Sequence, residues 1–391
     1  MRPIEEFVRE TANAIVLGAG DLVYKLTDGK YPAHLFSKNV PHPFIGTDVK
    51  IVRQSDDTTT IAKFNPDGTI SDDEFTILLA TDMHVDRDNK LIYKAMDMLY
   101  KHIADVKPDL VIFTGDFLVT DYQQFDSVQF ARFMEDIGIY WAFVFGNHEA
   151  REEKEFHKYF MLKNLTKYEH CLTKIGPSDL FGFGNFFIEI LNADGNVSQC
   201  LSLFDSGRDI YPRYIEEYNL PKEYENTYDF IKENQIVWYE NHIRALQAKQ
   251  GDVKSMLFMH IPVPEYKEVM DYDPDEKPIP TGKPTGKADV IYGEMHESVG
   301  CSKYNSGLFE RARELGATAF FSGHDHINDF AAMYKGVLLA YVQMTGYEIY
   351  HMGDKFGLPE SEWMQGTTVV KINSDGNFRL KQNFTSKFLV K

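Results

Sequence analysis

Residues 75–84 read FTILLATDMH, a largely apolar run that ends in two polar side chains, Asp82 and His84. A short apolar run rich in branched and aromatic residues predicts a buried strand. Residues i and i+2 of an extended chain point the same way, so Asp82 and His84 would share one face at the end of this strand. Carboxylate and imidazole groups are ligands that proteins use for zinc, manganese and iron.

The same arrangement occurs four more times along the chain. The further segments are LVIFTGD at 110–116, YWAFVFGNHE at 140–149, MLFMH at 256–260 and AFFSGHDH at 319–326. Each joins a strand-like run to aspartate, asparagine or histidine, and open α/β sheets bind their ligands at such strand ends. One such segment alone is a common turn sequence, but the order and placement of all five predict a dinuclear metal site.

The segments between these strands predict an α/β fold. Apolar spacing favours helices at 90–103, 123–137 and 151–162, which alternate with the first three strands. This alternation is typical of βαβ units and of a sheet with helices on its faces. Later runs predict strands of a second sheet at 317–322, 330–333, 337–343 and 367–372. We therefore expect a two-sheet β-sandwich flanked by helices, with the metals at the carboxyl ends of strands.

The rest of the chain is less regular. Apolar spacing predicts further helices at 4–16, 234–248 and 306–315, and hairpins at 48–64 and 186–204. Residues 262–300 are rich in proline, glycine and charge and predict a long loop. His296 in this loop either lines a pocket or is a solvated loop residue.

Composition limits the possible functions. The 391 residues are 43% hydrophobic and 14% aromatic, as in a globular protein. The formal net charge of −18 repels phosphate backbones, so extended nucleic acid is not an expected partner. Three cysteines form no disulfide framework, and no apolar stretch reaches the length of a membrane span. We expect a cytoplasmic protein, or a secretory one if a signal was removed before residue 1.

The five segments together resemble the calcineurin-like metallophosphoesterase superfamily, whose motif string is D-x-H, G-D, G-N-H-D/E, H and G-H-x-H. The resemblance covers about residues 75–341. Within it, HIPVPE at 260–265, SGLF at 306–309 and GHDHINDF at 323–330 resemble the purple-acid-phosphatase-like branch of fungi and plants. The resemblance implies a four-layer fold. We expect the catalytic domain at 71–391, and an N-terminal extension at 1–70, outside the resemblance, that packs on it.

The resemblance also implies a role for each ligand and two divalent metal ions, Mn, Zn or Fe. A first metal would be held by Asp82, His84 and His326, a second by Asn147, His260 and His324, and Asp116 would bridge them. In purple acid phosphatases a tyrosine three positions after the bridging aspartate ligates ferric iron. Here that position is Val119, so the tyrosinate chromophore is expected to be missing.

The expected reaction is hydrolysis of a phosphate monoester by a hydroxide that bridges the metals. His148, next to ligand Asn147, is the candidate for protonating the leaving oxygen. Asp121 is a weaker candidate partner for His148. Glu149 would either orient an imidazole or be an exposed acid at a helix start.

Three functions remain open at this point. The leading one is a phosphatase whose partner is a phosphorylated protein or a small phosphate ester. The same motif string also serves phosphodiesterases, here one for small nucleotides. A non-catalytic metal-binding scaffold is the third, although no expected ligand is missing from the sequence.

Overall fold

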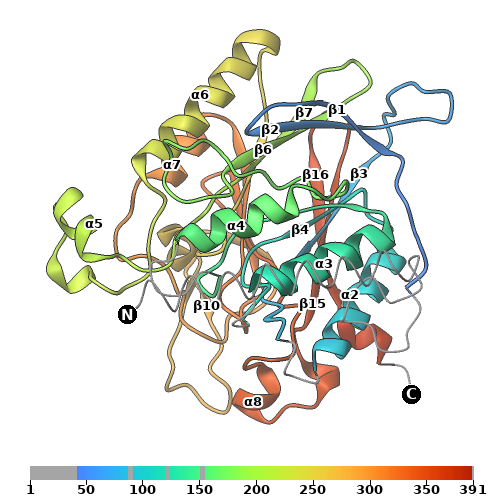
Figure 1. Cartoon of the computed structure of the whole chain (residues 1–391). Coiled ribbons are helices and arrows are strands. Elements are labelled where there is room, and N and C mark those ends of the chain that lie inside the picture. The colour runs from blue at the N-terminus through green and yellow to red at the C-terminus, as the bar shows by residue number, and fades with distance from the viewer. Residues whose placement is uncertain (1–41, 87–90, 120–122, 150–154, 390–391) are drawn as a thin grey trace, which may run out of the picture.

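The computed structural model describes residues 42–86, 91–119, 123–149 and 155–389 (Figure 1). The helix predicted at 4–16 and the candidate Asp121 lie outside these residues. None of the described helices combines the length and the apolar character that crossing a bilayer requires.

The first sheet has five strands in the order β16-β15-β3-β4-β5. Its centre is formed by β3 (Phe75–Ala80), β4 (Leu110–Phe113) and β5 (Tyr140–Phe143), which run parallel to one another. The strands β15 (Gly366–Ile372) and β16 (Phe378–Phe384) complete it as an antiparallel pair, and β15 lies antiparallel to β3. The carboxyl ends of β3, β4 and β5 therefore meet at one edge.

The second sheet has nine strands in the order β1-β2-β6-β7-β8-β12-β14-β13-β11. In chain order these are β1 (Val49–Gln54), β2 (Thr58–Lys63), β6 (Phe186–Leu191), β7 (Val197–Leu203), β8 (Ser255–Phe258), β11 (Asp289–Tyr292), β12 (Ala317–Ser322), β13 (Ala331–Tyr334) and β14 (Val337–Tyr341). The central strands β7, β8, β12 and β14 are parallel neighbours. A separate two-stranded ribbon joins β9 (Met270–Asp271) to β10 (Lys283–Pro284).

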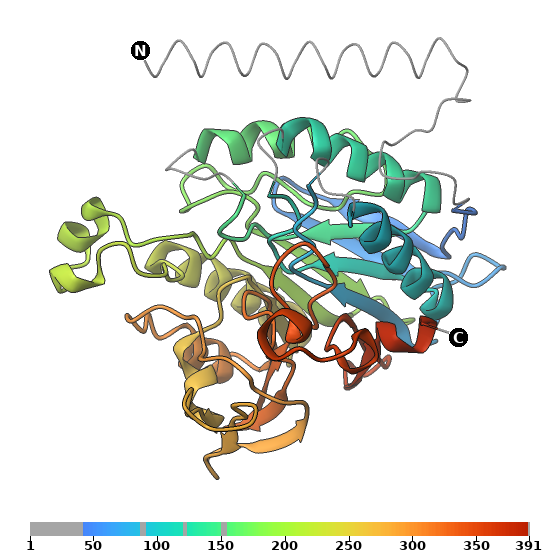
Figure 2. The same ribbon diagram turned by 90° about the horizontal axis from the view of Figure 1, so that it is seen from below.

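The two sheets pack face to face, with helices on both outer faces. Along β3, Ile77 and Leu79 point into the apolar layer between the sheets, whereas Leu78 and Ala80 point toward the helices. The outer face of the five-stranded sheet is covered by α2 (Ile92–Val106), α3 (Gln123–Ile137) and α4 (Glu155–Leu165). The outer face of the other sheet is covered by α6 (Glu233–Gln250) and α7 (Leu308–Glu314). Figure 2 shows these layers, and they confirm the predicted helix-flanked sandwich.

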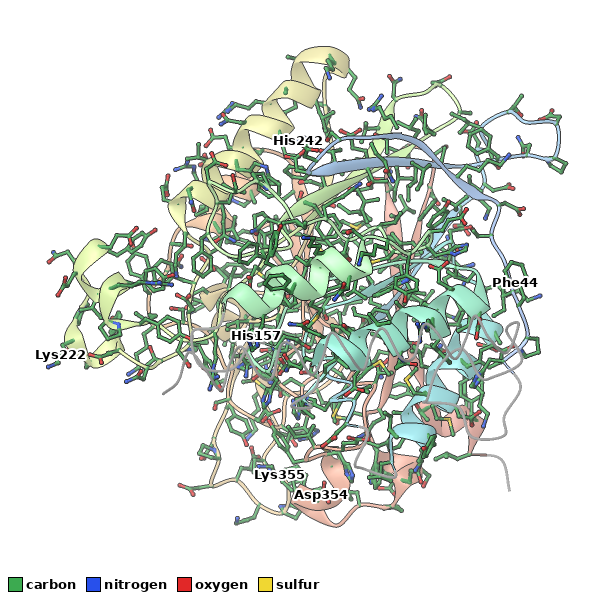
Figure 3. All side chains as sticks on the ribbon, viewed as in Figure 1. Phe44, His157, Lys222, His242, Asp354 and Lys355 are labelled. Atoms are coloured by element: carbon green, nitrogen blue, oxygen red, sulfur yellow. The ribbon has the colours of Figure 1, made fainter. Side chains whose placement is uncertain are left out.

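An arm projects from this body between β7 and α6. It carries α5 (Pro212–Glu217) and the 3-10 turn η1 (Lys222–Tyr224), and Lys222 marks its tip in Figure 3. A small aromatic core of its own holds it together, with Tyr214 and Phe230 among the buried residues.

Two predictions about the second sheet were wrong. The strand at 367–372 belongs to the first sheet as β15, because it returns along β3 rather than along the neighbours of β14. The segment 262–300 is not one long loop, since it contains β9, β10 and β11, and β11 forms an edge of the nine-stranded sheet through its pairing with β13. The hairpin at 186–204 is confirmed as β6 and β7.

Candidate metal centre

The five predicted segments converge at one place, where the ends of β3, β4 and β5 face the ends of β8 and β12. Among the described residues, three overlapping groups of side chains lie close enough to share a cation. They are Asp82 with His84 and His326, His84 with Asp116 and His148, and Asp116 with His260 and His324. Both sheets contribute, so the site forms only when the sandwich is assembled.

The first group surrounds one carboxylate oxygen. Oδ1 of Asp82 lies 3.4 Å from Nε2 of His326 and 3.7 Å from Nε2 of His84. The two imidazole nitrogens lie 3.3 Å apart. Three ligand atoms thus point at a common centre.

The second group surrounds Nε2 of His260. This nitrogen lies 3.2 Å from Oδ2 of Asp116, 3.0 Å from Oδ1 of Asn147 and 3.3 Å from Nδ1 of His324. The other ring nitrogen of His260 contacts the carbonyl oxygen of Thr114 at 2.8 Å, which fixes the ring orientation.

Asp116 lies between the two groups. Its Oδ2 is 3.8 Å from Nε2 of His84 and 3.2 Å from Nε2 of His260. Its Oδ1 accepts a hydrogen bond of 2.7 Å from the backbone N–H of His148. One oxygen therefore faces both groups while the other is held by the backbone.

The arrangement fits a bound cation. Oδ1 of Asp82 is buried and has no hydrogen-bond partner among the described residues. A buried carboxylate oxygen without a partner is costly, and a metal ion would satisfy it. Imidazole nitrogens combined with carboxylate and amide oxygens are suitable ligands for Zn²⁺, Mn²⁺ and Fe²⁺.

Backbone strain is concentrated at these residues. Four of the candidate ligands have a positive φ that non-glycine residues rarely adopt, namely Asp82 (49°), His84 (47°), Asp116 (50°) and His324 (80°). At Gly146, a side-chain Cβ would lie 2.1 Å from Oδ1 of Asp116, so only glycine fits there. Strain of this kind persists where the surrounding structure enforces it and is typical of functional sites.

Comparison with known proteins identifies the family. The family model described as calcineurin-like phosphoesterase matches residues 75–328, which contain all five segments. The chain belongs to this family. The match confirms the resemblance to this family that the sequence predicted.

Several named proteins are similar to this chain. It is 27% identical to "Probable inactive purple acid phosphatase 14" of Arabidopsis thaliana, over 74% of this chain and 73% of that protein. It is 31% identical to "Phosphatase DCR2" of Saccharomyces cerevisiae, over 59% of this chain and 38% of that protein. A dimetal phosphatase from Danio rerio is 15% identical, with a TM-score of 0.48 over 80% of this chain and 97% of that one.

The charges of the candidate metal centre compensate one another. Burial would raise the pKa of Asp82, but the imidazoles of His326, His84 and His260 around it hold that pKa well below its usual value. Burial would lower the pKa of His260, but the attraction of Asp116 and Asp82 raises it to about 10. A proton on His260 thus balances the carboxylates when no metal is bound.

His148 lies at the open side of the centre. Its side chain is 29% exposed, whereas those of Asp116 and His260 are 2% or less exposed. Its Nε2 is 3.9 Å from Oδ2 of Asp116, and its ring lies 5.0 Å from that of His84. It is therefore placed where a ligand of the metals would meet solvent.

Glu149 differs from both interpretations of the sequence. It is 1% exposed, and within the described residues its carboxylate is hydrogen-bonded to backbone N–H groups and not to an imidazole. Its carboxylate accepts from the backbone N–H groups of Gly146, Asp116 and Leu118 at 2.7, 3.1 and 3.0 Å. Glu149 ties the loop after β4 to the loop after β5, because those N–H groups have lost their strand partners.

Two tyrosines beside the centre were not predicted from the sequence. The ring of Tyr228, on the projecting arm, meets that of His324 edge-on at 4.4 Å. Tyr350 stacks on His326 at 4.5 Å. Neither follows an apolar strand, and with 22 tyrosines in the chain no local signal distinguishes them.

Proposed function

We propose that the chain is a dinuclear-metal-dependent phosphatase that hydrolyses phosphate monoesters, either a phosphorylated protein or a small phosphate ester. The observation that carries this proposal is the cluster around the unsatisfied Oδ1 of Asp82, in which every expected ligand type is present. Membership of the phosphoesterase family supports it.

Seven side chains would hold the metals in this proposal. The first ion would be held by Asp82, His84 and His326, the second by Asn147, His260 and His324, with Asp116 between them. Two bound divalent cations would supply Lewis-acid stabilisation of phosphoryl oxygens and a nucleophilic hydroxide at neutral pH.

Three residues that are not proposed metal ligands have further roles in this proposal. His148 is the candidate proton donor to the leaving oxygen, since its side chain is 29% exposed and its Nε2 lies 3.9 Å from Oδ2 of Asp116. Glu149 keeps the loops after β4 and β5 in place, so Asp116 and Asn147 stay in register. The aromatic ring of Tyr228 can pack against a bound leaving group beside His324.

Hydrolysis of two chromogenic esters tests the proposal. Metal-free protein supplied with Mn²⁺, Zn²⁺ or Fe²⁺ should hydrolyse p-nitrophenyl phosphate with a kcat/KM at least about tenfold above that for bis(p-nitrophenyl) phosphate. An Asp82→Asn variant, prepared in parallel, should lose the activity together with bound metal. Preference for the diester would indicate a phosphodiesterase instead.

The same assay distinguishes an enzyme from a non-catalytic metal-binding scaffold. The plant relative carries "inactive" in its name, whereas the yeast relative is named a phosphatase. Protein that binds two metals yet hydrolyses neither ester would be a metal-binding scaffold, and the proposal would be wrong.

A further inference from the structure

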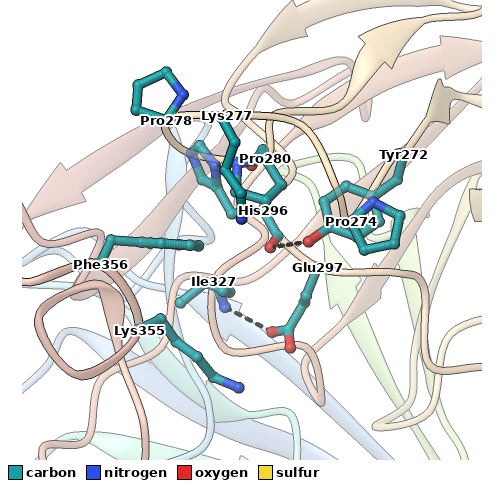
Figure 4. Close-up of a pocket in the computed structure, with 10 residues that line it drawn as sticks. All are labelled: Tyr272, Pro274, Lys277, Pro278, Pro280, His296, Glu297, Ile327, Lys355 and Phe356. Carbon is teal, nitrogen blue, oxygen red and sulfur yellow. Dashed lines mark hydrogen bonds between the residues drawn. The ribbon is translucent and has the colours of Figure 1, made fainter.

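A cavity of about 500 Å³ lies next to the metal centre. It is lined by residues of the segments 272–280 and 296–297, by Ile327 and by the end of α8 (Met352–Phe356), as Figure 4 shows. The apolar part of the lining is formed by Ile327, Phe356 and three prolines, Pro274, Pro278 and Pro280. The polar part is formed by Tyr272, His296, Glu297, Lys277 and Lys355.

Two connections join this cavity to the metal centre. Ile327, on its wall, directly follows the candidate ligand His326. Glu297 accepts a hydrogen bond from the backbone N–H of Ile327 at 2.9 Å and from the hydroxyl of Tyr350 at 2.7 Å. Tyr350 in turn stacks on the His326 ring at 4.5 Å. Cavity and centre therefore share a wall.

The ring of Tyr350 also contacts Lys355, one of the two lysines that line the cavity. The ammonium of Lys355 lies 4.4 Å from the centre of the Tyr350 ring. The centre of the Tyr350 ring lies 4.5 Å from that of the His326 ring. The distance from the Lys355 ammonium to the His326 ring therefore cannot exceed the sum of 4.4 and 4.5 Å. That separation is within the length of a small phosphate ester.

The two lysines of the cavity have no carboxylate partner among the described residues. Neither Lys277 nor Lys355 forms an ion pair with any carboxylate in the part of the chain that the structure describes. Glu297 has both carboxylate oxygens occupied by hydrogen bonds. His296 is held by the carbonyl of Pro280 at 2.8 Å and by Glu294 at 3.0 Å. Figure 4 shows Lys277 at the upper side of the lining and Lys355 at its lower side, and Figure 3 shows Lys355 at the surface on α8.

Lys277 and Lys355 both line this cavity, and the chain as a whole has 59 acidic and 41 basic residues. Elsewhere in the same segment, Lys283 pairs with Glu276 at 2.8 Å and Lys287 contacts Glu268. An ammonium without a carboxylate partner is available to bind an anion of the ligand. The apolar floor beside it suits the carbon skeleton that carries such an anion.

We propose that this cavity binds a second anionic group, a carboxylate or a phosphate, on the leaving-group side of the substrate. The inference rests on the proposed phosphatase function and narrows its substrates to phosphate esters with two anionic groups. Lys277 and Lys355 bind the second group while the metal centre holds the phosphate that is removed. The chain would thereby select doubly anionic esters in spite of its own negative charge.

Matched substrates test this cavity. The phosphate ester of 3-(4-hydroxyphenyl)propanoic acid and the ester of its primary amide share a leaving group and differ in one charge. We expect kcat/KM to be roughly tenfold or more higher for the acid. A third ester with phosphate in place of the carboxylate shows which of the two anions the cavity prefers. In a Lys277→Gln/Lys355→Gln variant, the ratio of acid to amide should fall toward one.

Lys283→Gln is the matched control, because it removes a lysine of the same segment that is paired outside the cavity, and it should keep the wild-type ratio. Equal kcat/KM for acid, phosphate and amide would overturn the cavity inference while leaving the phosphatase proposal intact. If no ester is hydrolysed, the phosphatase proposal fails. Calorimetric titration of the acid and amide esters into wild type and the double variant then still tests whether the cavity binds the second anion. Equal affinity for both esters would overturn it.

Discussion

In the proposed mechanism Asp116 supplies negative charge to both metal positions, and His148 transfers a proton. Asp116 is buried, faces both ligand groups and accepts the backbone N–H of His148. His148 is the more exposed of the two, with 29% of its side chain accessible against 2% for Asp116. The backbone N–H of His148 holds the loop after β5 against the Asp116 carboxylate. Because this hydrogen bond does not involve the His148 side chain, replacing that side chain should affect catalysis, whereas replacing Asp116 should affect metal binding.

We predict that His148→Ala lowers kcat by roughly 10²–10⁴ while both metals remain bound. The loss should be largest for alkyl phosphates, whose leaving oxygen needs a proton, and smaller for p-nitrophenyl phosphate, whose leaving group departs as an anion. Asp116→Asn is the comparison, because it removes the shared charge and should lower metal content. Metal analysis and the leaving-group dependence of kcat distinguish the two. Equal impairment for all leaving groups would rule out a general-acid role.

Val119 predicts the colour of the iron-loaded protein. It occupies the position at which purple acid phosphatases have a tyrosine ligand, and its aliphatic side chain cannot ligate iron. We therefore predict no strong visible tyrosinate band after reconstitution with Fe³⁺, measured by absorption spectroscopy. A purple preparation would show that another tyrosine reaches the metal.

The ligands of this centre were predictable because each lies within a few residues of a strand end that a local pattern reveals. Asp82, His84 and Asp116 are examples, and the structure brings them together. Glu149 was misread because its partners are backbone N–H groups of another loop. Contacts that depend on which loops become neighbours leave no trace in a local pattern.

At the scale of elements, Asp329 joins two edges of the structure. Its Oδ1 accepts a 2.8 Å hydrogen bond from the backbone N–H of Glu294, just after β11, and its Oδ2 contacts the side-chain amide of Gln382 on β16. The side chain is 3% exposed. Burial, strengthened by the negative charge of Glu294, raises the pKa of the Asp329 carboxyl to about 7.

This raised pKa makes the stability depend on pH. In the unfolded chain Asp329 ionises near pH 4, whereas in the fold it keeps its proton up to about pH 7. Its contribution to the free energy of unfolding should therefore fall as pH rises from about 4 to 7. Asp329→Asn cannot ionise, so its unfolding free energy should decline less over this window in denaturant titrations. Asp275→Asn, at an exposed position, is the control, and an identical pH slope in wild type and Asp329→Asn would contradict the assignment.

The order of strands was only partly predictable. Residues 367–372 have the apolar alternation of a strand, but that pattern is the same whether the strand joins one sheet or the other. The structure pairs β15 with β3, residue for residue from Thr368 opposite Leu79. Likewise, β11 is a short, half-exposed edge strand in a segment rich in proline and glycine, so its local pattern is weak.

At the scale of the whole molecule, the chain has a large negative net charge, and imidazole groups balance the carboxylates at the candidate metal centre. The net charge is −18, yet the centre that would bind phosphate is assembled from carboxylates and imidazoles of both sheets. In the metal-free protein the raised pKa of His260, about 10, means that this imidazole holds a proton at neutral pH. A metal ligand must be deprotonated, so a metal has to displace that proton.

We predict that metal binding at pH 7 releases one or more protons per chain, and that affinity for Mn²⁺ or Zn²⁺ rises with pH. Calorimetric titration in two buffers with different ionisation enthalpies measures the number released. Because His260 has the raised pKa, a His260→Asn variant should release fewer protons on binding any metal that it still takes up. Binding with no proton release in the wild type would contradict the charge state assigned to the centre.

The central claim is that this phosphoesterase chain holds two metal ions in one cluster built from both sheets. Its most direct test is the metal content per chain, measured by elemental analysis after metal-free protein is reconstituted and freed of excess ion, with p-nitrophenyl phosphate hydrolysis followed at each addition. The account predicts that wild type takes up two ions per chain, that activity reaches its maximum at that ratio, and that Asp116→Asn retains fewer. Full activity at one ion or none, or two ions retained by Asp116→Asn, would contradict it.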